Sequence, residues 1–354
     1  MIVLARRSIF LRIKKAQLLL GFLLFFICCE KSPNLLAING LTMGTDYNIK
    51  VVTYQDIDPV KLKFSVDSIL IDINKQMSTW DPLSEISNFN RWESLEPYKV
   101  SDSFLDVVKS SQSLSSKTDG MFDVTVLDLL KLWGFGPNPQ LGIPAKKNID
   151  SILSYTGFEN ISFTHESLIK KNKKTKIDLN AIAKGFGVDA VFNLIKSKGY
   201  SDVFVEIGGE VRFSGNNSKN KKWSVGLENP PNNTLNKGKP FFGVLSNQAS
   251  AIATSANYRN YVDLDGTLLG HTINPKTGFP IMTNVLSVTV ISKTCMEADG
   301  WATALMTMDY EEGSKLIKSF KNINAVWLLN GENDSRYIMK SKGCVLTDAI
   351  YDIR

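Results

Sequence analysis

The chain has 354 residues, 43% of them hydrophobic and 21% charged, which is enough to bury a sizeable core in one large domain or two closely fused lobes. The formal net charge is +6, but five of the 41 lysines and arginines lie in residues 1–28. The other 36 face 35 acids, so the rest of the chain carries about +1 and is not predicted to bind nucleic acid.

Residues 1–28 have the pattern of a secretory signal. Basic side chains at 6–15 precede a short apolar run at 18–27, and no acid occurs before Glu30. The run is short for a membrane-spanning helix, which needs roughly 20 apolar residues. We therefore predict that the chain is exported.

The apolar run ends in the letters FFICCEKSPN, which are similar to a bacterial lipoprotein cleavage site with Cys29 as the residue to be lipidated. Lipidation of Cys28, plain signal cleavage and an uncleaved anchor are the alternatives. We expect a lipidated tether over residues 29–39 and a folded domain over residues 40–354.

The predicted elements of the first half begin with a strand at 40–52, where polar and apolar residues alternate. Asp58 and Pro59 then supply an N-cap and a first-turn proline for a helix that ends at Met77. The later elements up to residue 207 are helices at 103–117, 125–133 and 180–198 and strands at 159–163, 167–170, 175–179 and 202–207. The stretch KKNKK at 170–174 is predicted to be a solvated hairpin tip.

Short strands dominate the second half of the chain. They are expected at 211–214, 222–227, 241–246, 249–254, 258–263, 268–273, 285–291, 324–329, 335–340 and 344–348. Helices are expected from about Cys295 and over 310–321. Because strands neither alternate strictly with helices nor stand alone, we predict an α+β fold with mixed or largely antiparallel sheets flanked by helices.

Three stretches combine polar side chains with glycines. In the first, KIDLNAIAKGFGVDA (176–190), a helix is expected to begin at Ala181, capped by Asn180, with unpaired N–H groups in its first turn. Such a helix end binds phosphate, and Lys184 would add positive charge. The structural alternative is an ordinary capped helix whose glycines pack closely on a sheet.

The second stretch, CMEADGWATALMTM (295–308), places Asp299 and Thr303 on one face of a predicted helix. A carboxylate and a hydroxyl are hard oxygen ligands, which suit Mg²⁺. Two side chains are too few for a closed site, as expected where substrate phosphates and water complete the coordination. The alternative is a solvent-facing acid beside a threonine that is bonded within its helix.

The third stretch, HTINPKTGFPI (271–281), contains one of the two histidines of the chain. Residues 274–278 have the composition of a turn, so His271 is predicted at a strand end just before a loop. A histidine there can take a proton from an incoming hydroxyl near neutral pH. The alternative is a polar strand-end residue. His165 is interpreted as a surface residue.

The remaining motifs exclude several classes of site. Cys295 and Cys344 are the only cysteines after residue 29, and they could form one disulfide. The chain has no CxxC, HExxH, P-loop or GxSxG motif. Zinc, P-loop and hydrolase-elbow sites are therefore not predicted.

Taken together, the polar stretches resemble the ApbE family of FAD:protein FMN transferases. The resemblance extends over about residues 40–310 in the family's order and implies an ApbE-like fold. It is carried by MGTDYNIK (43–50), MSTWDPLSEISNFN (77–90), GMFDVTVLDLLKLWGFGP (120–137), IDLNAIAKGFGVD (177–189), VEIGGEVRFSG (205–215), TSANYRNY (254–261), HTINPKTGFPI (271–281) and ADGWATAL (298–305).

The resemblance implies roles for individual residues. Asp299 and Thr303 match the family's magnesium ligands, with the backbone of Ala181 and the carbonyl of Ala302 as further oxygens. His271 matches the base that activates the acceptor hydroxyl; the alternative is that it only orients the flavin phosphate. The positions that contact FAD in relatives are Met43, Trp80, Met121, Phe122, Asp123, Asp178, Lys184 and Ile273.

Some of these implied roles also follow physical expectation. Trp80 and Phe122 would offer flat surfaces to a ring system, with core packing as the alternative. Asp123 and Asp178 would hold a ribose or adenine donor. Arg259 is a family landmark that would contact phosphate.

Members of the family cleave the pyrophosphate of FAD, pass FMN to a Thr or Ser hydroxyl of a target protein and release AMP, with Mg²⁺ as cofactor. Their acceptors include flavin-carrying subunits of membrane redox complexes of the sodium-translocating quinone reductase and Rnf types. We therefore expect an exported enzyme, lipid-anchored to the periplasmic side of the inner membrane. The alternatives are a non-catalytic FAD-binding lipoprotein and a Mg²⁺-dependent FAD pyrophosphatase that gives FMN and AMP.

Overall fold

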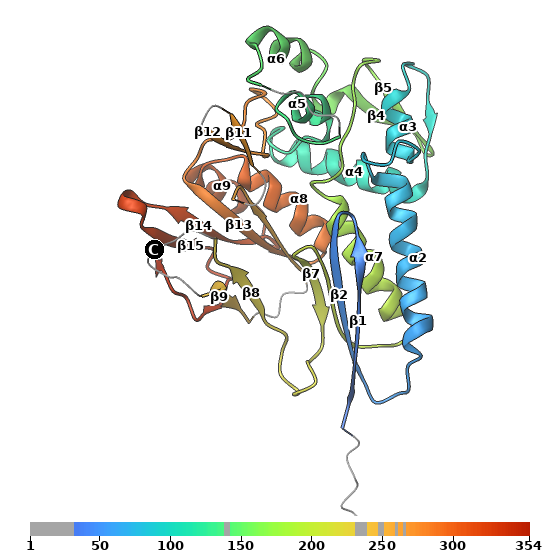
Figure 1. Ribbon diagram of the computed structural model, residues 1–354, viewed down its shortest axis with the longest axis vertical. Coiled ribbons are helices and arrows are strands. Elements are labelled where there is room, and N and C mark those ends of the chain that lie inside the picture. Colours follow the sequence, from blue (N-terminus) through green and yellow to red (C-terminus); the bar gives the residue numbers. More distant parts are fainter. Residues whose placement is uncertain (1–31, 138–141, 231–238, 247–250, 259–260, 265–266) are drawn as a thin grey trace, which may run out of the picture.

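A nine-stranded sheet forms the centre of the protein, in the order β1-β2-β6-β7-β10-β13-β14-β15-β17. The computed structural model describes residues 32–137, 142–230, 239–246, 251–258, 261–264 and 267–354. Neighbouring strands pair antiparallel, except that β15 and β17 are parallel. Helices pack on this sheet (Figure 1), which confirms the predicted α+β class with largely antiparallel sheets.

The bounds of the elements are as follows. The central sheet contains β1 (Asn34–Thr42), β2 (Thr45–Thr53), β6 (Asp202–Ile207), β7 (Glu210–Ser214), β10 (Ala251–Ala256), β13 (Val285–Ser292), β14 (Asn324–Asn330), β15 (Arg336–Lys340) and β17 (Asp352–Ile353). The smaller sheets contain β16 (Leu346–Thr347), β9 (Phe241–Leu245) and β8 (Val225–Glu228); β3 (Tyr98–Lys99), β5 (Ser167–Lys170) and β4 (Ile161–Phe163); and β11 (Tyr261–Leu264) with β12 (Thr267–Gly270). The α-helices are α2 (Pro59–Met77), α3 (Glu85–Arg91), α4 (Asp102–Lys117), α5 (Leu127–Leu132), α6 (Lys146–Leu153), α7 (Ala183–Ser197), α8 (Cys295–Met306) and α9 (Tyr310–Ile317).

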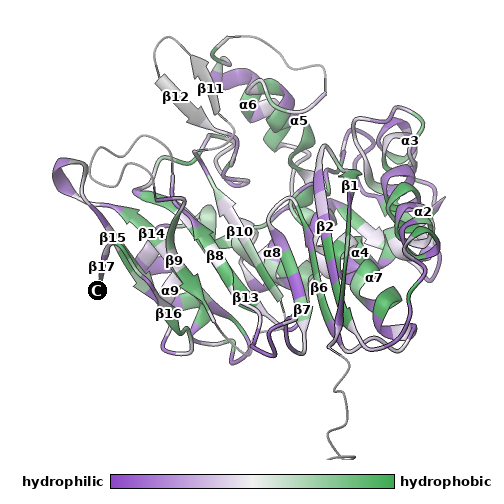
Figure 2. Ribbon diagram, turned by 60° about the horizontal axis from the view of Figure 1, so that its bottom comes forward, coloured by the Kyte–Doolittle hydropathy of each residue, from purple (hydrophilic) through white to green (hydrophobic). Residues whose placement is uncertain are grey.

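Both faces of the central sheet are apolar, and each packs into a different part of the core. In β14, Ala325, Trp327 and Leu329 belong to the cluster that includes the buried side chains of α4 and α8. Val326 and Leu328 point to the other face, into a cluster shared with the small sheet β16-β9-β8. Successive residues of a strand face opposite sides, so one strand serves both cores. Figure 2 shows hydrophobic strands at the centre and hydrophilic loops along the lower edge.

Helix α2 begins where the sequence predicts. The Asp58 carboxylate accepts hydrogen bonds from the N–H groups of Val60 and Lys61, and Pro59 occupies the first helical position. The apolar stripe of the helix is buried against the sheet. Among the described residues, no helix combines the length and apolar character that a membrane crossing requires.

The N-terminal strand differs from its prediction. The single strand predicted over 40–52 is a hairpin, in which β1 and β2 pair along their whole length. Met43 and Gly44 form the turn with φ of 49° and 72°, the two positive values that fit a tight hairpin connection. β1 begins at Asn34, so residues 34–39 pair within the sheet, although the sequence assigns them to a tether.

Residues 175–179 do not form the predicted strand. Ile177 donates its N–H to the side-chain oxygen of Asn90 and accepts from the Asn90 amide, both at 2.8 Å. The N–H of Asp178 donates to the carbonyl of Val124 at 2.7 Å. The backbone groups of Ile177 and Asp178 that would pair with a neighbouring strand therefore hydrogen-bond to the Asn90 side chain and to Val124. The alternation of polar and apolar residues cannot reveal such partners.

Two short helices, α3 with 7 residues and α6 with 8, are not predicted from the sequence. Segments of about two turns are too short to establish a helical period. Helix α3 is nevertheless capped by Ser84, whose hydroxyl accepts from the N–H of Ser87.

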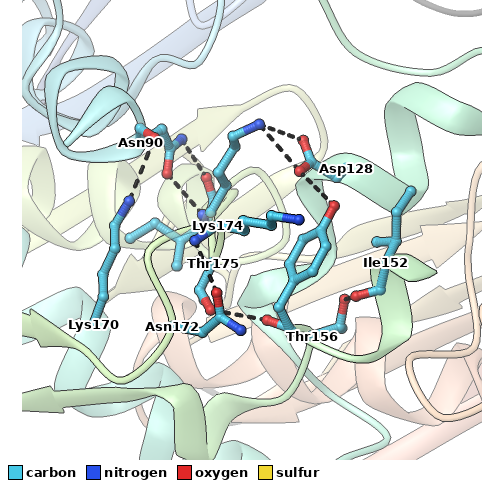
Figure 3. Close-up of polar contacts among 11 residues, drawn as sticks. Asn90, Asp128, Ile152, Thr156, Lys170, Asn172, Lys174 and Thr175 are labelled. Carbon is cyan, nitrogen blue, oxygen red and sulfur yellow. Dashed lines mark hydrogen bonds and ion pairs between the residues drawn. The ribbon is translucent and has the colours of Figure 1, made fainter. Parts of the chain in front are cut away.

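The lysine-rich stretch 170–174 is only partly a solvated tip. Lys171, Lys173 and Lys174 are exposed, but Lys170 is only 1% exposed. Its ammonium donates to the backbone carbonyl of Asn90 at 3.4 Å, a contact visible in Figure 3. The prediction was wrong for Lys170, because the antiparallel pairing of β4 with β5 continues through this residue.

Candidate active site

Segments that are far apart in the sequence line one cavity of about 1950 Å³. The β1–β2 turn, the start of α7, helix α8, the end of β10 and the segment after β12 all contribute to its wall. The predicted site residues that line it are Met43, Trp80, Met121, Phe122, Asp123, Asp178, Ala181, Lys184, His271, Ile273, Asp299 and Thr303. The cavity is large enough for a dinucleotide.

Helices α7 and α8 bring three of the four predicted metal ligands, Ala181, Asp299 and Thr303, to one cavity. The hydroxyl of Thr303 lies 3.5 Å from the carbonyl oxygen of Ala181 and 3.3 Å from the hydroxyl of Ser255. Asp299 is 4% exposed, and one of its carboxylate oxygens accepts from the N–H of Gly185 at 2.9 Å. Close packing permits this arrangement, because a Cβ on Gly185 would lie 2.4 Å from the carbonyl oxygen of Cys295.

The donor set of this corner fits a hard divalent cation. It offers a carboxylate, a hydroxyl and a backbone carbonyl, all of them oxygen ligands of the kind that Mg²⁺ prefers. Among the described residues, no cluster of three or more His, Cys, Asp or Glu side chains could hold a metal by itself. A cation here would therefore depend on Ala181, Asp299 and Thr303 together with oxygens of a substrate.

Helix α7 begins later than predicted. Its first residue is Ala183, and Ile182 stands at the cap position without a side-chain capping bond. Asn180 is not the cap, because its N–H and its amide both donate to the carboxylate of Asp178. One first-turn donor of the helix, the N–H of Gly185, is already bound by Asp299.

A buried ion pair stands beside the predicted ligands, and sequence reasoning missed half of it. Lys184 points into the cavity wall and forms an ion pair of 2.8 Å with Glu210, the first residue of β7. Glu210 is 2% exposed, and its second oxygen has no hydrogen-bond partner among the described residues. The sequence contained one signal that could have identified Glu210: an acid directly after Gly208-Gly209, at a strand position where an apolar residue is expected.

Burial perturbs both carboxyl groups of this cluster. The pKa of Glu210 is raised to about 8, mainly by burial and further by the charge of Asp299, against the opposing effect of Lys184. Burial also raises the pKa of Asp299, while Lys184 and the Gly185 N–H oppose the rise. Desolvated acids that face a cavity are typical of functional sites.

His271 lies one residue beyond β12, as predicted, and lines the cavity. The following turn is closed by a hydrogen bond from the N–H of Gly278 to the carbonyl of Asn274, and Gly278 has the positive φ of 72° that such a turn requires. The ring of Phe135 meets the imidazole edge-on, with the ring centres 6.3 Å apart. This aromatic contact fixes one side of the histidine.

The two predicted aromatic surfaces are not equivalent. Trp80 is 64% exposed at the cavity, whereas Phe122 is 2% exposed and belongs to the core. Only Trp80 therefore offers a free flat surface to a ring system.

Asp123 and Asp178 support the cavity wall with their carboxylates. Asp123 accepts from the N–H and hydroxyl of Thr125 and from the N–H of Phe158, and burial raises its pKa to about 6. Asp178 accepts from Thr79 and twice from Asn180. A carboxylate has about four acceptor positions, so each acid keeps little capacity for a ligand.

Several predicted residues lie away from the cavity or outside the described part. Ala302 is fully buried within α8 and does not line the cavity described here. Arg259 and Cys29 lie outside the described residues. Cys295 and Cys344 are free, buried thiols, and burial raises the pKa of both. The disulfide between them is not formed.

Comparison with known proteins relates the chain to one family. The model of the ApbE family matches residues 43–327. The chain is 40% identical over 296 residues to the FAD:protein FMN transferase of Vibrio cholerae, with 83% of this chain and 87% of that protein covered. It is 32% identical over 330 residues to the FAD:protein FMN transferase of Escherichia coli K12, covering 90% and 92%.

Solved structures agree with the fold. The flavin transferase ApbE from Vibrio cholerae superposes with a TM-score of 0.78 at 34% identity, covering 88% of this chain and 98% of that one. The apo form of the flavinyl transferase ApbE from Pseudomonas stutzeri superposes with a TM-score of 0.79 at 30% identity, covering 88% and 96%.

Proposed function

This chain belongs to the ApbE family, and from that premise we propose that it transfers FMN from FAD to a Thr or Ser hydroxyl of a target protein, with Mg²⁺ as cofactor and AMP as leaving group. The chain is a transferase like its relatives. The observation that carries the finer proposal is the single cavity that holds Ala181, Asp299, Thr303 and His271.

The proposed reaction breaks one bond of the FAD pyrophosphate. The acceptor hydroxyl oxygen bonds to the phosphorus of the FMN half, and the bond from that phosphorus to the bridging oxygen breaks. AMP leaves with the bridging oxygen, and His271 takes the hydroxyl proton. The product is a phosphoester between FMN and the acceptor.

Positioning and charge neutralisation supply most of the catalysis in a phosphoryl transfer. Ala181, Asp299 and Thr303 would hold Mg²⁺, which neutralises negative charge on phosphate oxygens when it is bound. Lys184 adds a positive charge to the same wall, and Glu210 holds its ammonium in place at 2.8 Å. Trp80 offers its exposed ring to one of the two ring systems of FAD.

The cellular setting is part of the proposal. The basic and apolar segment 1–28 would direct export, and a lipid on Cys29 would hold the enzyme on the periplasmic side of the inner membrane. The acceptors would be flavin-carrying subunits of membrane redox complexes, of the sodium-translocating quinone reductase or Rnf type.

The test mixes the purified chain with FAD, Mg²⁺ and a candidate acceptor domain, followed by in-gel flavin fluorescence and assay of AMP. Flavin covalently bound to the acceptor, with equimolar AMP, is the expected result. Free FMN with AMP would instead identify a pyrophosphatase that uses water. Bound FAD without either product would identify a binding protein and overturn the proposal.

A further inference from the structure

Four neighbouring strands of the central sheet meet the solvent at the end opposite the Met43–Gly44 turn: β1 and β6 begin there, and β2 and β7 end there. Pairing places Asn34 beside Thr53 and brings the start of β6 at Asp202 beside the end of β7 at Ser214. We call this end of β1, β2, β6 and β7 the basal edge. The described structure begins at this end, because β1 starts at Asn34.

Two segments that meet at the basal edge are rich in exposed lysines. Residues 196–202 and 215–224 are joined by a hydrogen bond from the N–H of Asn216 to the carboxylate of Asp202, the single acid of both segments, at 2.7 Å. Their exposed lysines are Lys196, Lys198, Lys219, Lys221 and Lys222. The loop 54–58 adds two acids, so the basal edge remains basic.

The other end of the sheet has the opposite character. Its turns at 43–46, 208–210 and 330–335 contain four acids and neither lysine nor arginine. The first two of these turns line the active-site cavity. These three turns therefore carry a net negative charge, whereas the segments at the basal edge carry a net positive charge.

Exposed apolar side chains accompany the lysines. Tyr54 is 62% exposed directly after β2, and Val60 and Phe64 are each 75% exposed in the first turns of α2. Val60 and Phe64 are four residues apart, so they share one face of the helix. Basic side chains beside aromatic and aliphatic ones are typical of surfaces that meet an anionic membrane.

We propose that the basal edge rests on an anionic membrane surface and turns the flavin cleft away from it. The inference depends on the N-terminal attachment of the proposed function, because five residues from Cys29 to Asn34 span at most about 17 Å. Strand β2 then separates Thr53 from the cleft-side turn by roughly 25 Å, at about 3.3 Å per residue. The cleft is thereby held at a fixed height, open to acceptor domains that project from the bilayer.

A pair of matched labels tests the orientation. Ser218→Cys at the basal edge and Ser151→Cys in α6 replace exposed serines, and the native Cys295 and Cys344 are buried. Each variant, in its mature form with residues 1–28 removed and Cys29 lipidated as proposed, carries a fluorophore on the introduced cysteine. It is placed on vesicles of equimolar phosphatidylglycerol and phosphatidylcholine with a nitroxide headgroup quencher. We expect strong quenching at position 218 and little at position 151.

Charge reversal tests the chemistry of the contact. Replacing Lys219, Lys221 and Lys222 by Glu should lower the apparent affinity of the basal edge for the vesicle surface, read from the quenching at position 218. Each lysine contributes about fivefold, so the triple variant should lose roughly 10²-fold. The matched control replaces Lys171, Lys173 and Lys174 by Glu and should change this affinity little. Equal quenching of both labels, quenching on pure phosphatidylcholine, or an unchanged charge-reversal variant would each overturn the proposal. Flavin transfer measured in detergent reports separately on the proposed function.

Discussion

In two regions of the fold, buried charged side chains have different neighbours. In the cleft, Glu210 and Asp299 lie with Lys184, which pairs with Glu210 at 2.8 Å. Between α3 and β5, the ammonium of Lys170 donates to the Asn90 carbonyl at 3.4 Å and lies 4.8 Å from the centre of the Phe89 ring. Within the part of the chain that the structure describes, no carboxylate forms an ion pair with it.

Burial shifts pKa values in both regions, upward for the acid and downward for the lysine. The pKa of Glu210 is raised to about 8, and that of Lys170 is lowered to about 8. The cleft residues open onto a large cavity, which is the setting in which desolvated charge typically acts on a substrate. Lys170 lies outside the lining of that cavity, so its burial is a cost to the free energy of folding without a role in the chemistry. The lesson is that a perturbed pKa marks a functional site only where it meets an accessible cavity.

The substitution Asp299→Ala tests the cleft half of this comparison and should have the largest effect. It removes the carboxylate of the proposed cation site, so flavin transfer should fall by about 10³-fold or more. In-gel fluorescence and AMP release measure it, and Asp72→Ala on the exposed side of α2 is the matched control. Near-normal turnover with Mg²⁺ would contradict the assignment of Asp299.

His271→Ala should have the next largest effect. Loss of an acid–base group costs roughly 10²-fold in rate, while FAD remains bound. Single-turnover rates and FAD affinity, measured on the same protein, separate the two. If FAD affinity collapsed and the rate at saturation stayed normal, His271 would be an orienting residue instead.

Trp80→Ala should reduce FAD affinity by about tenfold, because the exposed ring would lose its contact with the substrate. The rate at saturating FAD should change little. Titration of FAD fluorescence measures the affinity, and Trp92→Ala, which lies outside the cavity lining and packs against Tyr98, is the control. Equal losses for both tryptophans would assign Trp80 to general stability.

Lys170→Met tests the other half of the comparison and should have the smallest effect. It replaces a buried ammonium by an apolar side chain of similar length, so the free energy of unfolding at neutral pH should rise by about 1–2 kcal/mol. Flavin transfer should not change. A loss of stability would show that the contacts with Asn90 and Phe89 outweigh the cost of burial.

The pH dependence of that gain has a definite sign. The folded pKa of Lys170, about 8, lies below the ordinary value of 10.5, so the folded protein loses this proton first. Wild-type stability relative to Lys170→Met should therefore increase as pH rises from 8 toward 10.5. Chemical denaturation of both proteins across this range measures the difference in unfolding free energy, which should shrink toward zero as the pH approaches 10.5.

Much of the fold was accessible from local patterns, and the failures have a common cause. The cap at Asp58, the alternation in β6 and the glycine turn after His271 are properties of neighbouring residues, and each prediction was confirmed. The prediction of a strand at 175–179 was wrong because the backbone of Ile177 hydrogen-bonds to the side chain of Asn90, 87 residues away. The prediction that Lys170 is solvated was wrong because Phe89 and Asn90 of α3 contact its ammonium.

The candidate site shows the same division. Asp299 and Thr303 share a face of α8 because of helical spacing, which the sequence contains. Glu210 was missed because an acid at a strand start has no signature until Lys184 is seen beside it. Phe122 and Trp80 have similar local sequence character, and only packing separates the buried ring from the exposed one.

The sequence by itself determined the class of fold, most of the helices and strands, and the residue types that a dinucleotide site requires, because those follow from short-range periodicity and side-chain chemistry. Only the tertiary structure decided that these residues meet. The N–H of Gly185 bonds to a carboxylate 114 residues away, and that approach depends on how two helices pack on a shared sheet. Packing of distant segments is set by the whole core, so no local pattern contains it.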